Sequence, residues 1–184
     1  MGTKFSTRIW VSVVGIASIF LGSKGYADTV ISVADFGLKP DTRENAVAYV
    51  QKAIEACRGK EPVTLVFPEG RYDFWPQYAH EKNYYETNTY DVFPKRLAML
   101  FEGLHNITVD GNGSQFVMHD RIQPITVENC DGVTLKNFSI DWDIPLTAQA
   151  RVTKVGSDFF EIGINVLESP YIIEDGKLVF VGEG

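Results

Sequence analysis

The chain has 184 residues, of which 45% are hydrophobic and 22% are charged, so it is long enough for one domain with its own hydrophobic core. Its formal net charge is −7, which argues against a protein that binds nucleic acid or anionic lipid through a basic face. An acidic balance of this kind is compatible with a neutral ligand such as a sugar.

The segment 1–27 has the pattern of a secretory signal peptide. Lys4 and Arg8 form a basic start, residues 9–21 form an apolar segment too short to span a bilayer, and small residues lead up to a cleavage site between Ala27 and Asp28. We therefore expect a secreted or periplasmic protein with no stable membrane insertion after cleavage. Removal of this segment takes away Lys4, Arg8 and Lys24 but no acid, so the net charge changes from −7 to −10.

A helix is predicted over residues 41–58. Asp41 is placed to cap its N-terminus, Glu44 completes a capping box, and Gly59 closes the other end. The apolar stripe of this helix, with spacings of three and four residues, must cover another part of the molecule. Cys57 in this helix and Cys130 further on are predicted to be two buried thiols rather than a disulfide.

Short strands follow the helix. Residues 63–67 form a continuous apolar run bounded by prolines, as in strands buried on both faces, and a second strand resumes at Arg71. The segment between residues 72 and 93 is rich in aromatic side chains. Its loop is long enough to suggest a function, such as the wall of a sugar pocket, although packing over the first strands explains it equally well.

An internal repeat begins near residue 100. FEGLHNITVDG from Phe101 aligns with VENCDGVTLKN from Val127, and each copy is followed by another strand. Repeats of this length without helical periodicity indicate stacked coils of strands, and we predict a parallel β-helix. The helix at residues 41–58 would then cap the first coil.

The pattern changes after Pro145. The segments AQARVTKV, FFEIGIN and KLVFVGEG are separated by polar turns, one of which contains the hairpin dipeptide Asp175-Gly176. The sequence thus divides into a signal peptide (1–27), a cap with the first coils (28–145) and the start of an antiparallel β subdomain (146–184), and it reads as the front of a longer protein.

Two parts of the sequence resemble known families. ADFGLKPDTRENAVAYVQKAIEAC with VTLVFPEGRYDF resembles the start of pectin-lyase-like β-helix proteins. Within residues 90–150, YDVFPKRLAMLFEGLHNITVDGNGS with VENCDGVTLKNFSIDWDIPLTAQA resembles glycoside hydrolase family 110, the α-1,3-galactosidases. The resemblance implies an all-β fold, with a right-handed parallel β-helix and an inserted antiparallel β-barrel. It also implies an inverting exo-enzyme that releases terminal α-1,3-linked galactose from blood-group-B-type or linear glycans, without a cofactor or metal. Its catalytic carboxylates are expected beyond Gly184, so this chain alone is expected to be inactive.

Asp141, Trp142 and Asp143 are the candidate substrate-binding residues. In a strand, Asp141 and Asp143 share one face about 6.5–7 Å apart. This spacing is compatible with the roughly 6.5–9.5 Å between the carboxylates of an inverting glycosidase, but every such pair on a strand has it. Trp142 either stacks on galactose or packs inward, where strand alternation places it, and the acids alternatively cap the turn before Pro145.

Two further features leave alternatives open. The sequence His119-Asp120-Arg121 fits acid–base work or a sugar clamp, but a polar turn explains it equally well. At the level of function, the alternatives are a noncatalytic sugar-binding β-helix, another β-helix carbohydrate enzyme such as a polygalacturonase or lyase, and a product too short to fold. The acidic net charge disfavours a polygalacturonase or lyase, because its acidic substrate requires basic residues.

Overall fold

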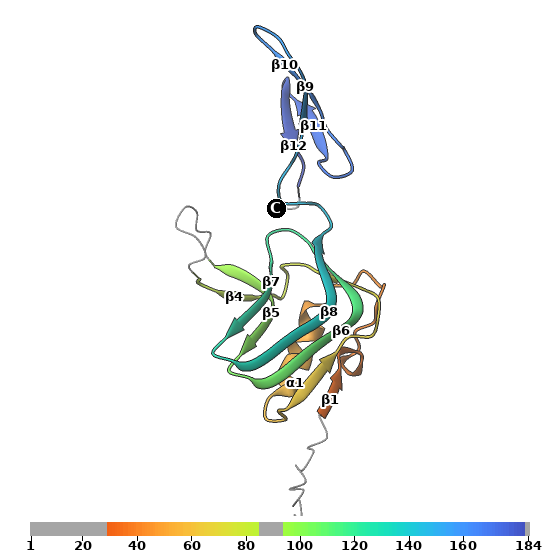
Figure 1. Cartoon of the computed structure of the whole chain (residues 1–184), viewed down its shortest axis with the longest axis vertical. Helices are drawn as coiled ribbons and strands as arrows, with labels where there is room; N and C mark the ends of the chain where they lie inside the picture. Colours follow the sequence, from red (N-terminus) through yellow and green to blue (C-terminus); the bar gives the residue numbers. More distant parts are fainter. Residues whose placement is uncertain (1–28, 85–93, 183–184) are drawn as a thin grey trace, which may run out of the picture.

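The computed structural model describes residues 29–84 and 94–182. Strands dominate, and the two helices both lie near the start of the described chain (Figure 1). The predicted cleavage site at Ala27 and Asp28 and part of the aromatic segment, residues 85–93, lie outside the described residues. Within them, no helix is both long and apolar enough to cross a membrane.

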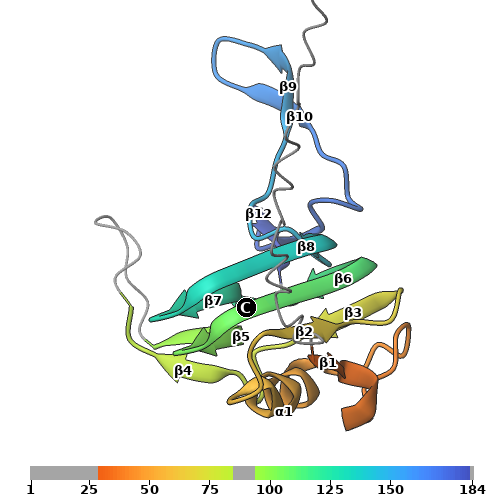
Figure 2. The same cartoon turned by 60° about the horizontal axis from the view of Figure 1, so that its bottom comes forward.

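The first sheet is built from parallel strands that stack in chain order. Its strands are β1 (Thr29–Ser32), β2 (Val63–Val66), β6 (His105–Met118) and β8 (Asp131–Trp142), and β3 (Arg71–Phe74) also pairs with β6. Every pairing in this sheet is parallel. The result is a layer in which β8 covers β6, and β6 covers β2 and β3 (Figure 2).

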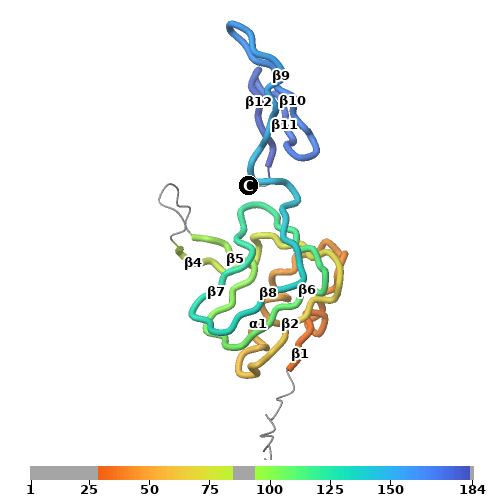
Figure 3. The backbone as a smooth tube through the Cα atoms, viewed as in Figure 1, coloured from red at the N-terminus to blue at the C-terminus, as the bar shows by residue number. Residues whose placement is uncertain are grey.

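A second sheet repeats the same stacking order. Strand β5 (Lys95–Glu102) pairs in parallel with β7 (Gln123–Glu128), and β4 (His80–Lys82) joins β5 in the antiparallel sense. The backbone passes from β5 to β6 and then from β7 to β8, so that the second pair lies along the first (Figure 3).

The predicted repeat is confirmed by the strand register. Ile107 pairs with Val133 and Val109 pairs with Leu135, which is the same offset that aligns Phe101 with Val127 in the sequence. The register shifts between Asp110 and Ser114, after which Ser114 pairs with Phe138. The all-β class with parallel sheets therefore agrees with the prediction.

Between the sheets lies a core of large apolar side chains. Phe67, Phe74 and Phe116 are fully buried, and the Phe116 ring stacks on that of Phe138 with a centroid distance of 4.8 Å. Helix α1 (Val47–Cys57) contributes its buried face to the same core and contacts β1, β2 and β5. It covers the first strands, as the apolar stripe predicted (Figure 2).

The predicted start of this helix is wrong. α1 begins at Val47, and its N-cap Ala46 has no side-chain capping bond, whereas Asp41 lies outside the helix with φ 62°. The Asp41 carboxylate instead accepts a hydrogen bond of 2.9 Å from the Arg71 backbone N–H. Pairing of this segment with β3 thus overrides the local capping pattern. A capping box is present earlier, at Ser32 of the short 3₁₀ helix η1 (Val33–Phe36).

The prediction for the cysteines holds in part. Both are free; Cys57 is buried, but Cys130 is only half-buried. Burial raises the pKa of the Cys57 thiol to about 11. Cys130 lies in the outermost described layer, next to β8, which explains its partial exposure.

After Pro145 the chain forms two antiparallel hairpins that project away from the parallel sheets (Figure 1). Strand β9 (Arg151–Val155) pairs with β10 (Phe160–Gly163), and β11 (Tyr171–Glu174) pairs with β12 (Lys177–Phe180). Asp175 and Gly176 have φ values of 49° and 72°, as the tight turn of a hairpin requires. The change to antiparallel strands was predicted, but β11 was not named as a strand.

Candidate functional site

Four polar side chains meet, two from β3 and two from the ends of β6 and β8. Arg71 and Asp73 lie on β3, His119 follows β6, and Asp143 follows β8. Backbone hydrogen bonds extend the ladder past the strand ends, from His119 N–H to the Phe74 carbonyl and from Asp143 N–H to the Met118 carbonyl. Parallel stacking therefore gathers residues that are far apart in the sequence. We call these four residues the Asp73 cluster.

Arg71 is the centre of this cluster. Its Nη2 atom lies 2.6 Å from Asp73 Oδ1 and 2.7 Å from Asp143 Oδ1, and its Nε also donates to Asp73. A second guanidinium, that of Arg43, lies 3.9 Å from Asp73 and 3.8 Å from Asp143. Two positive groups thus hold two carboxylates together, which fixes the position of Asp143 at the end of its strand.

The histidine of the cluster is fixed on two sides. His119 Nε2 lies 2.8 Å from Asp73 Oδ1, and its ring stacks on the Trp75 indole with a centroid distance of 3.9 Å and an angle of 7°. The His119 side chain is only 5% exposed. A buried aspartate that orients an imidazole is an arrangement used in catalytic and binding sites, and it also occurs in purely structural networks.

The two carboxylates of the cluster, one buried and one accessible, have different surroundings. Burial by itself raises the pKa of Asp73, but the hydrogen bonds from Arg71 and His119 outweigh it and hold that pKa below its usual value. The hydrogen bond to Asp73 also raises the pKa of Arg71. The Asp73 side chain has no exposed surface, whereas that of Asp143 is 37% exposed. Asp143 is therefore the carboxylate of the cluster that a ligand can reach.

The same cluster contains the donor types of a metal site. Ligand atoms of Asp73, His119 and Asp143 lie within 4.8 Å of one another. Arg71, however, already contacts both carboxylates at hydrogen-bonding distance and supplies positive charge between them. The contacts describe an ion-pair network whose accessible group is a carboxylate that can accept hydrogen bonds from hydroxyl groups.

The three residues singled out in the sequence have different surroundings. Asp143 belongs to the Asp73 cluster. Asp141 is exposed, and its Oδ1 accepts a hydrogen bond of 2.8 Å from the Trp142 N–H. Trp142 is half-buried against the core, and its Nε1 donates to the Asp120 carbonyl at 3.2 Å. Trp142 thus has the inward orientation that strand alternation favoured.

Sequence reasoning missed Arg43, Arg71 and Asp73. The alternation within Arg71-Tyr72-Asp73 places two opposite charges on one face of a strand, and the ends of stacked strands coincide. These two signals together point to the cluster, but only once β3 is known to stack on β6.

A second ion-pair group ties β4, β5 and β7 together. Lys82 Nζ lies 2.8 Å from both Glu102 and Glu128, which are register partners, and the Tyr84 hydroxyl donates to Glu128. The hydrogen bond from Lys82 lowers the pKa of Glu128. Lys82 relieves the repulsion of two adjacent acids, so this group fixes the edge of the second sheet.

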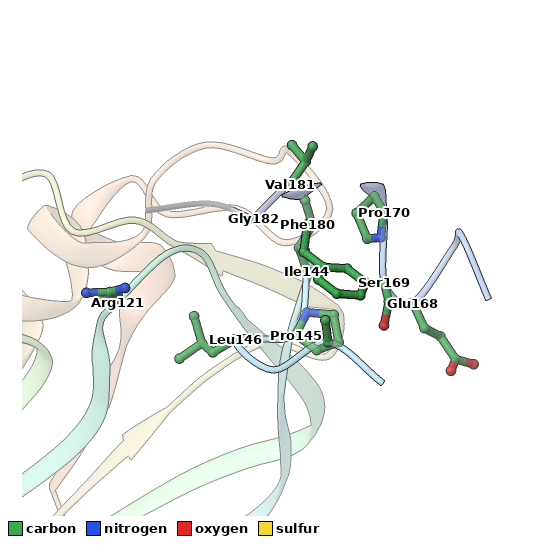
Figure 4. Close-up of a pocket in the computed structure, with 11 residues that line it drawn as sticks. Arg121, Ile144, Pro145, Leu146, Glu168, Ser169, Pro170, Phe180, Val181 and Gly182 are labelled. Carbon is green, nitrogen blue, oxygen red and sulfur yellow. The ribbon is translucent and has the colours of Figure 1, made fainter. Parts of the chain in front are cut away.

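A cavity of 220 Å³ lies where the hairpins join the parallel sheets (Figure 4). Ile144, Pro145 and Leu146 line one side, and Pro170 and Phe180 of the hairpin region line another. Arg121, which follows His119 and Asp120 in the sequence, also lines this cavity. Charged and polar residues, Arg121, Glu168 and Ser169, line it together with the apolar ones.

Several known proteins are similar to this chain in sequence. No family model matches the chain. α-1,3-galactosidase B of Bacteroides thetaiotaomicron is 61% identical over 158 residues, which is 86% of this chain and 26% of that protein. This chain is a homologue of part of the α-1,3-galactosidases. α-1,3-galactosidase A of Shewanella woodyi is 37% identical over 84% of the chain, and α-1,3-galactosidase B of Phocaeicola vulgatus is 36% identical over 96%.

The resemblance stated from the sequence is thereby confirmed. The chain spans about a quarter of the length of these galactosidases. The match to the first galactosidase covers 158 residues of this chain, which is more than the segment 1–143 contains. The match therefore extends beyond the parallel sheets into the hairpin region.

Proposed function

We propose that this chain is part of a secreted, inverting exo-α-galactosidase that removes terminal α-1,3-linked galactose from blood-group-B-type or linear glycans. The observation that carries the proposal is the 61% identity over 158 residues to a protein named α-1,3-galactosidase B. The inverting mechanism and the glycan class rest on the resemblance to glycoside hydrolase family 110. In this proposal the chain supplies the first part of the fold, and the catalytic carboxylates lie beyond Gly184.

The proposal includes a finer description of the fold. The two stacked parallel sheets are taken as the first coils of a right-handed parallel β-helix, with α1 as its cap and residues 28–145 as its extent. The hairpins of residues 146–184 are taken as the start of an inserted antiparallel β-barrel. The winding of the backbone from β5 through β8 supports the first assignment (Figure 3).

Asp143 is the proposed substrate contact, with Asp141 beside it. The Asp143 carboxylate is accessible and held by Arg71, so it can accept hydrogen bonds from sugar hydroxyls without reorganising. In this proposal Trp142 has a structural role, because its indole packs against the core and its Nε1 donates a hydrogen bond to the Asp120 carbonyl. Arg71 and Asp73 position Asp143 and do not contact the sugar.

Secretion is the remaining part of the proposal. The basic residues Lys4 and Arg8, the apolar segment 9–21 and the small residue Ala27 support cleavage before Asp28. Mass spectrometry of the exported protein tests this directly: the proposal predicts a mature N-terminus at Asp28, and a retained N-terminal segment contradicts it.

A chimeric enzyme tests the proposed reaction. The matching segment of the Bacteroides thetaiotaomicron galactosidase is replaced by this chain, and an α-1,3-galactoside is offered as substrate. Release of galactose that appears first as the β-anomer in an NMR time course supports an inverting exo-galactosidase. A folded chimera that binds the glycan but releases no galactose favours the noncatalytic sugar-binding alternative and contradicts the proposal.

A further inference from the structure

We propose that the loop of residues 75–79 and the start of α1 form a groove that binds a neutral oligosaccharide. The loop connects β3 to β4 and lies next to the Asp73 cluster, through the stack of Trp75 on His119. None of the residues that form this groove belongs to the three candidate substrate residues at the end of β8.

Two adjoining cavities make up the groove. The first has a volume of 640 Å³ and the second 380 Å³, and both are lined by Asn45 and Tyr78. Because they share these two residues, the cavities lie next to each other, and together they offer room for more than one sugar ring. The first is lined by Asn45, Trp75, Pro76, Gln77, Tyr78, Ala79, Glu81, Arg96 and Asp120.

The loop is held in one conformation before any ligand arrives. Asn45 Nδ2 donates to the Gln77 carbonyl at 2.8 Å, and Gln51 Nε2 donates to the Tyr78 carbonyl at 2.9 Å. Tyr78 has a φ of 69°, a conformation that is rare for an aromatic residue and that these two bonds maintain. A fixed, strained loop that presents an exposed side chain is a feature of binding sites.

Aromatic side chains supply surfaces for sugar rings. Tyr78 is 65% exposed although it is a large aromatic residue. Trp75, which is half-buried, lies in the first cavity with it, and Tyr49 lines the second cavity. The flat, partly polar faces of tyrosine and tryptophan pack well against ligands with both C–H and hydroxyl groups, and sugar rings have both.

The charges of the groove favour an uncharged ligand. Glu81 and Arg96 form an ion pair at 3.3 Å on the wall of the first cavity, which Asp120 also lines. Glu44 and Lys52 line the second cavity. These three acids and two bases offer donors and acceptors for hydroxyl groups. They do not offer the basic surface that a phosphate, sulfate or uronic acid polymer requires.

The groove therefore fits the sugars that follow the terminal residue of a glycan. That the glycan ends in α-1,3-linked galactose rests on the proposed function, whereas the preference for a neutral sugar chain rests on the lining of the groove. The two parts are separable, because binding by the groove does not require hydrolysis.

Calorimetric titration of the purified protein tests the groove. The probes are a linear neutral tetrasaccharide that ends in α-1,3-galactose and the trisaccharide that lacks this galactose. We expect both to bind, and Tyr78→Ala to raise both Kd values about fivefold to tenfold, through loss of one stacking surface. Tyr78→Phe keeps the ring and should bind as the parent does.

Phe160→Ala is the matched control, because Phe160 is equally exposed, at 67%, but lies on a hairpin. Equal Kd values for the parent and Tyr78→Ala, with an unchanged circular dichroism spectrum, would overturn the proposed binding groove. Failure of either probe to bind would overturn it as well. If both probes bind in a Tyr78-dependent way while the chimera releases no galactose, the groove stands and the proposed hydrolysis fails.

Discussion

The parallel sheets and the hairpins use apolar side chains in opposite ways. In residues 29–143, large side chains such as Phe67, Leu104 and Phe116 are fully buried. In the described residues 146–182, Ser169 is the only buried residue, and Phe160 and Leu167 are 67% and 89% exposed. The sheets therefore owe their order to a shared core, and the hairpins owe theirs to local pairing and turns.

This difference indicates that the parallel sheets, and not the hairpins, can be stable by themselves. Two-stranded hairpins are only marginally stable in water without a packed face, and exposed apolar patches on soluble proteins often mark contacts with other protein. Val127, Leu135 and Ile140 on the outer face of β7 and β8 are also exposed, at 38–46%. Both surfaces are suited to cover by additional chain, and the related galactosidases are about four times as long as the matched segment.

The largest expected effect comes from truncating a core side chain in the parallel sheets, compared with the same truncation in a hairpin. Phe116→Ala removes a fully buried ring that contacts Phe67, Phe74 and Phe138, and we expect it to lower the free energy of unfolding by about 3–5 kcal/mol. Phe160→Ala in β10 should change it by less than about 0.5 kcal/mol. Urea denaturation followed by circular dichroism measures both, and equal effects would mean that the hairpins share the core.

The second-largest loss of stability is expected in the Asp73 cluster. Asp73→Asn removes the buried negative charge that Arg71 and His119 contact, and we expect a loss of about 3 kcal/mol in the free energy of unfolding. Lys154→Gln on the hairpin, whose ion pair with Glu161 is more than half exposed, should cost less than about 1 kcal/mol. A cost for Asp73→Asn as small as that of the control would contradict an energetic role for the cluster.

The pH dependence of stability follows from the same aspartate. Its pKa is lower in the folded protein than the ordinary value of 3.8, so the unfolded chain binds its proton first. Its contribution to stability is therefore complete above about pH 4 and is lost as the pH falls through the folded pKa. Unfolding free energies between pH 6 and 3 should fall less steeply for Asp73→Asn than for the parent, and parallel curves would refute the assignment.

Alanine substitutions at two glycines, one in each region, extend the comparison of the parallel sheets with the hairpins. A side chain at Gly111 would lie 2.5 Å from Phe138 Cβ and 2.7 Å from the Asn137 carbonyl oxygen, so Gly111→Ala forces β6 and β8 apart at a cost of about 1–3 kcal/mol. Gly176 has open space around it, and Gly176→Ala costs only the strain of its φ of 72°, about 1 kcal/mol, within one hairpin. Hydrogen exchange would show protection lost across β6 and β8 in the first variant and only in β11 and β12 in the second.

The smallest effect concerns the two thiols. Burial raises the pKa of Cys57 to about 11, so this thiol should not react with an aromatic disulfide reagent at pH 8 until the protein unfolds. The half-buried Cys130 should react first. A Cys130→Ala variant that still reacts as fast as the parent would show that the α1 face opens in the native state.

Elements with strong local signals could be predicted from the sequence. The internal repeat predicted the register of the first part of β6 and β8, up to Asp110, and Asp175-Gly176 predicted the β11–β12 turn, because both depend on patterns within one or two strands. The start of α1 was missed because residues 41–46 pair with β3, a contact that the local capping pattern does not contain.

The candidate site was predictable only in part. Asp143 was identified from the paired acids at the end of a strand, and the inward orientation of Trp142 follows from alternation. Arg43, Arg71 and Asp73 could not be joined to it, since the contacts of both arginines with Asp143 link distant parts of the sequence and depend on how the strand ends stack.

The most direct test of the account is the rate of galactose release by the chimera and its Asp143→Asn variant. We predict an active chimera, a decrease in kcat/KM of about tenfold or more for Asp143→Asn through loss of a charged hydrogen-bond acceptor, and a smaller decrease for Asp141→Asn. A folded chimera that releases no galactose would contradict the proposed function, and an unchanged kcat/KM in Asp143→Asn would remove Asp143 from the site.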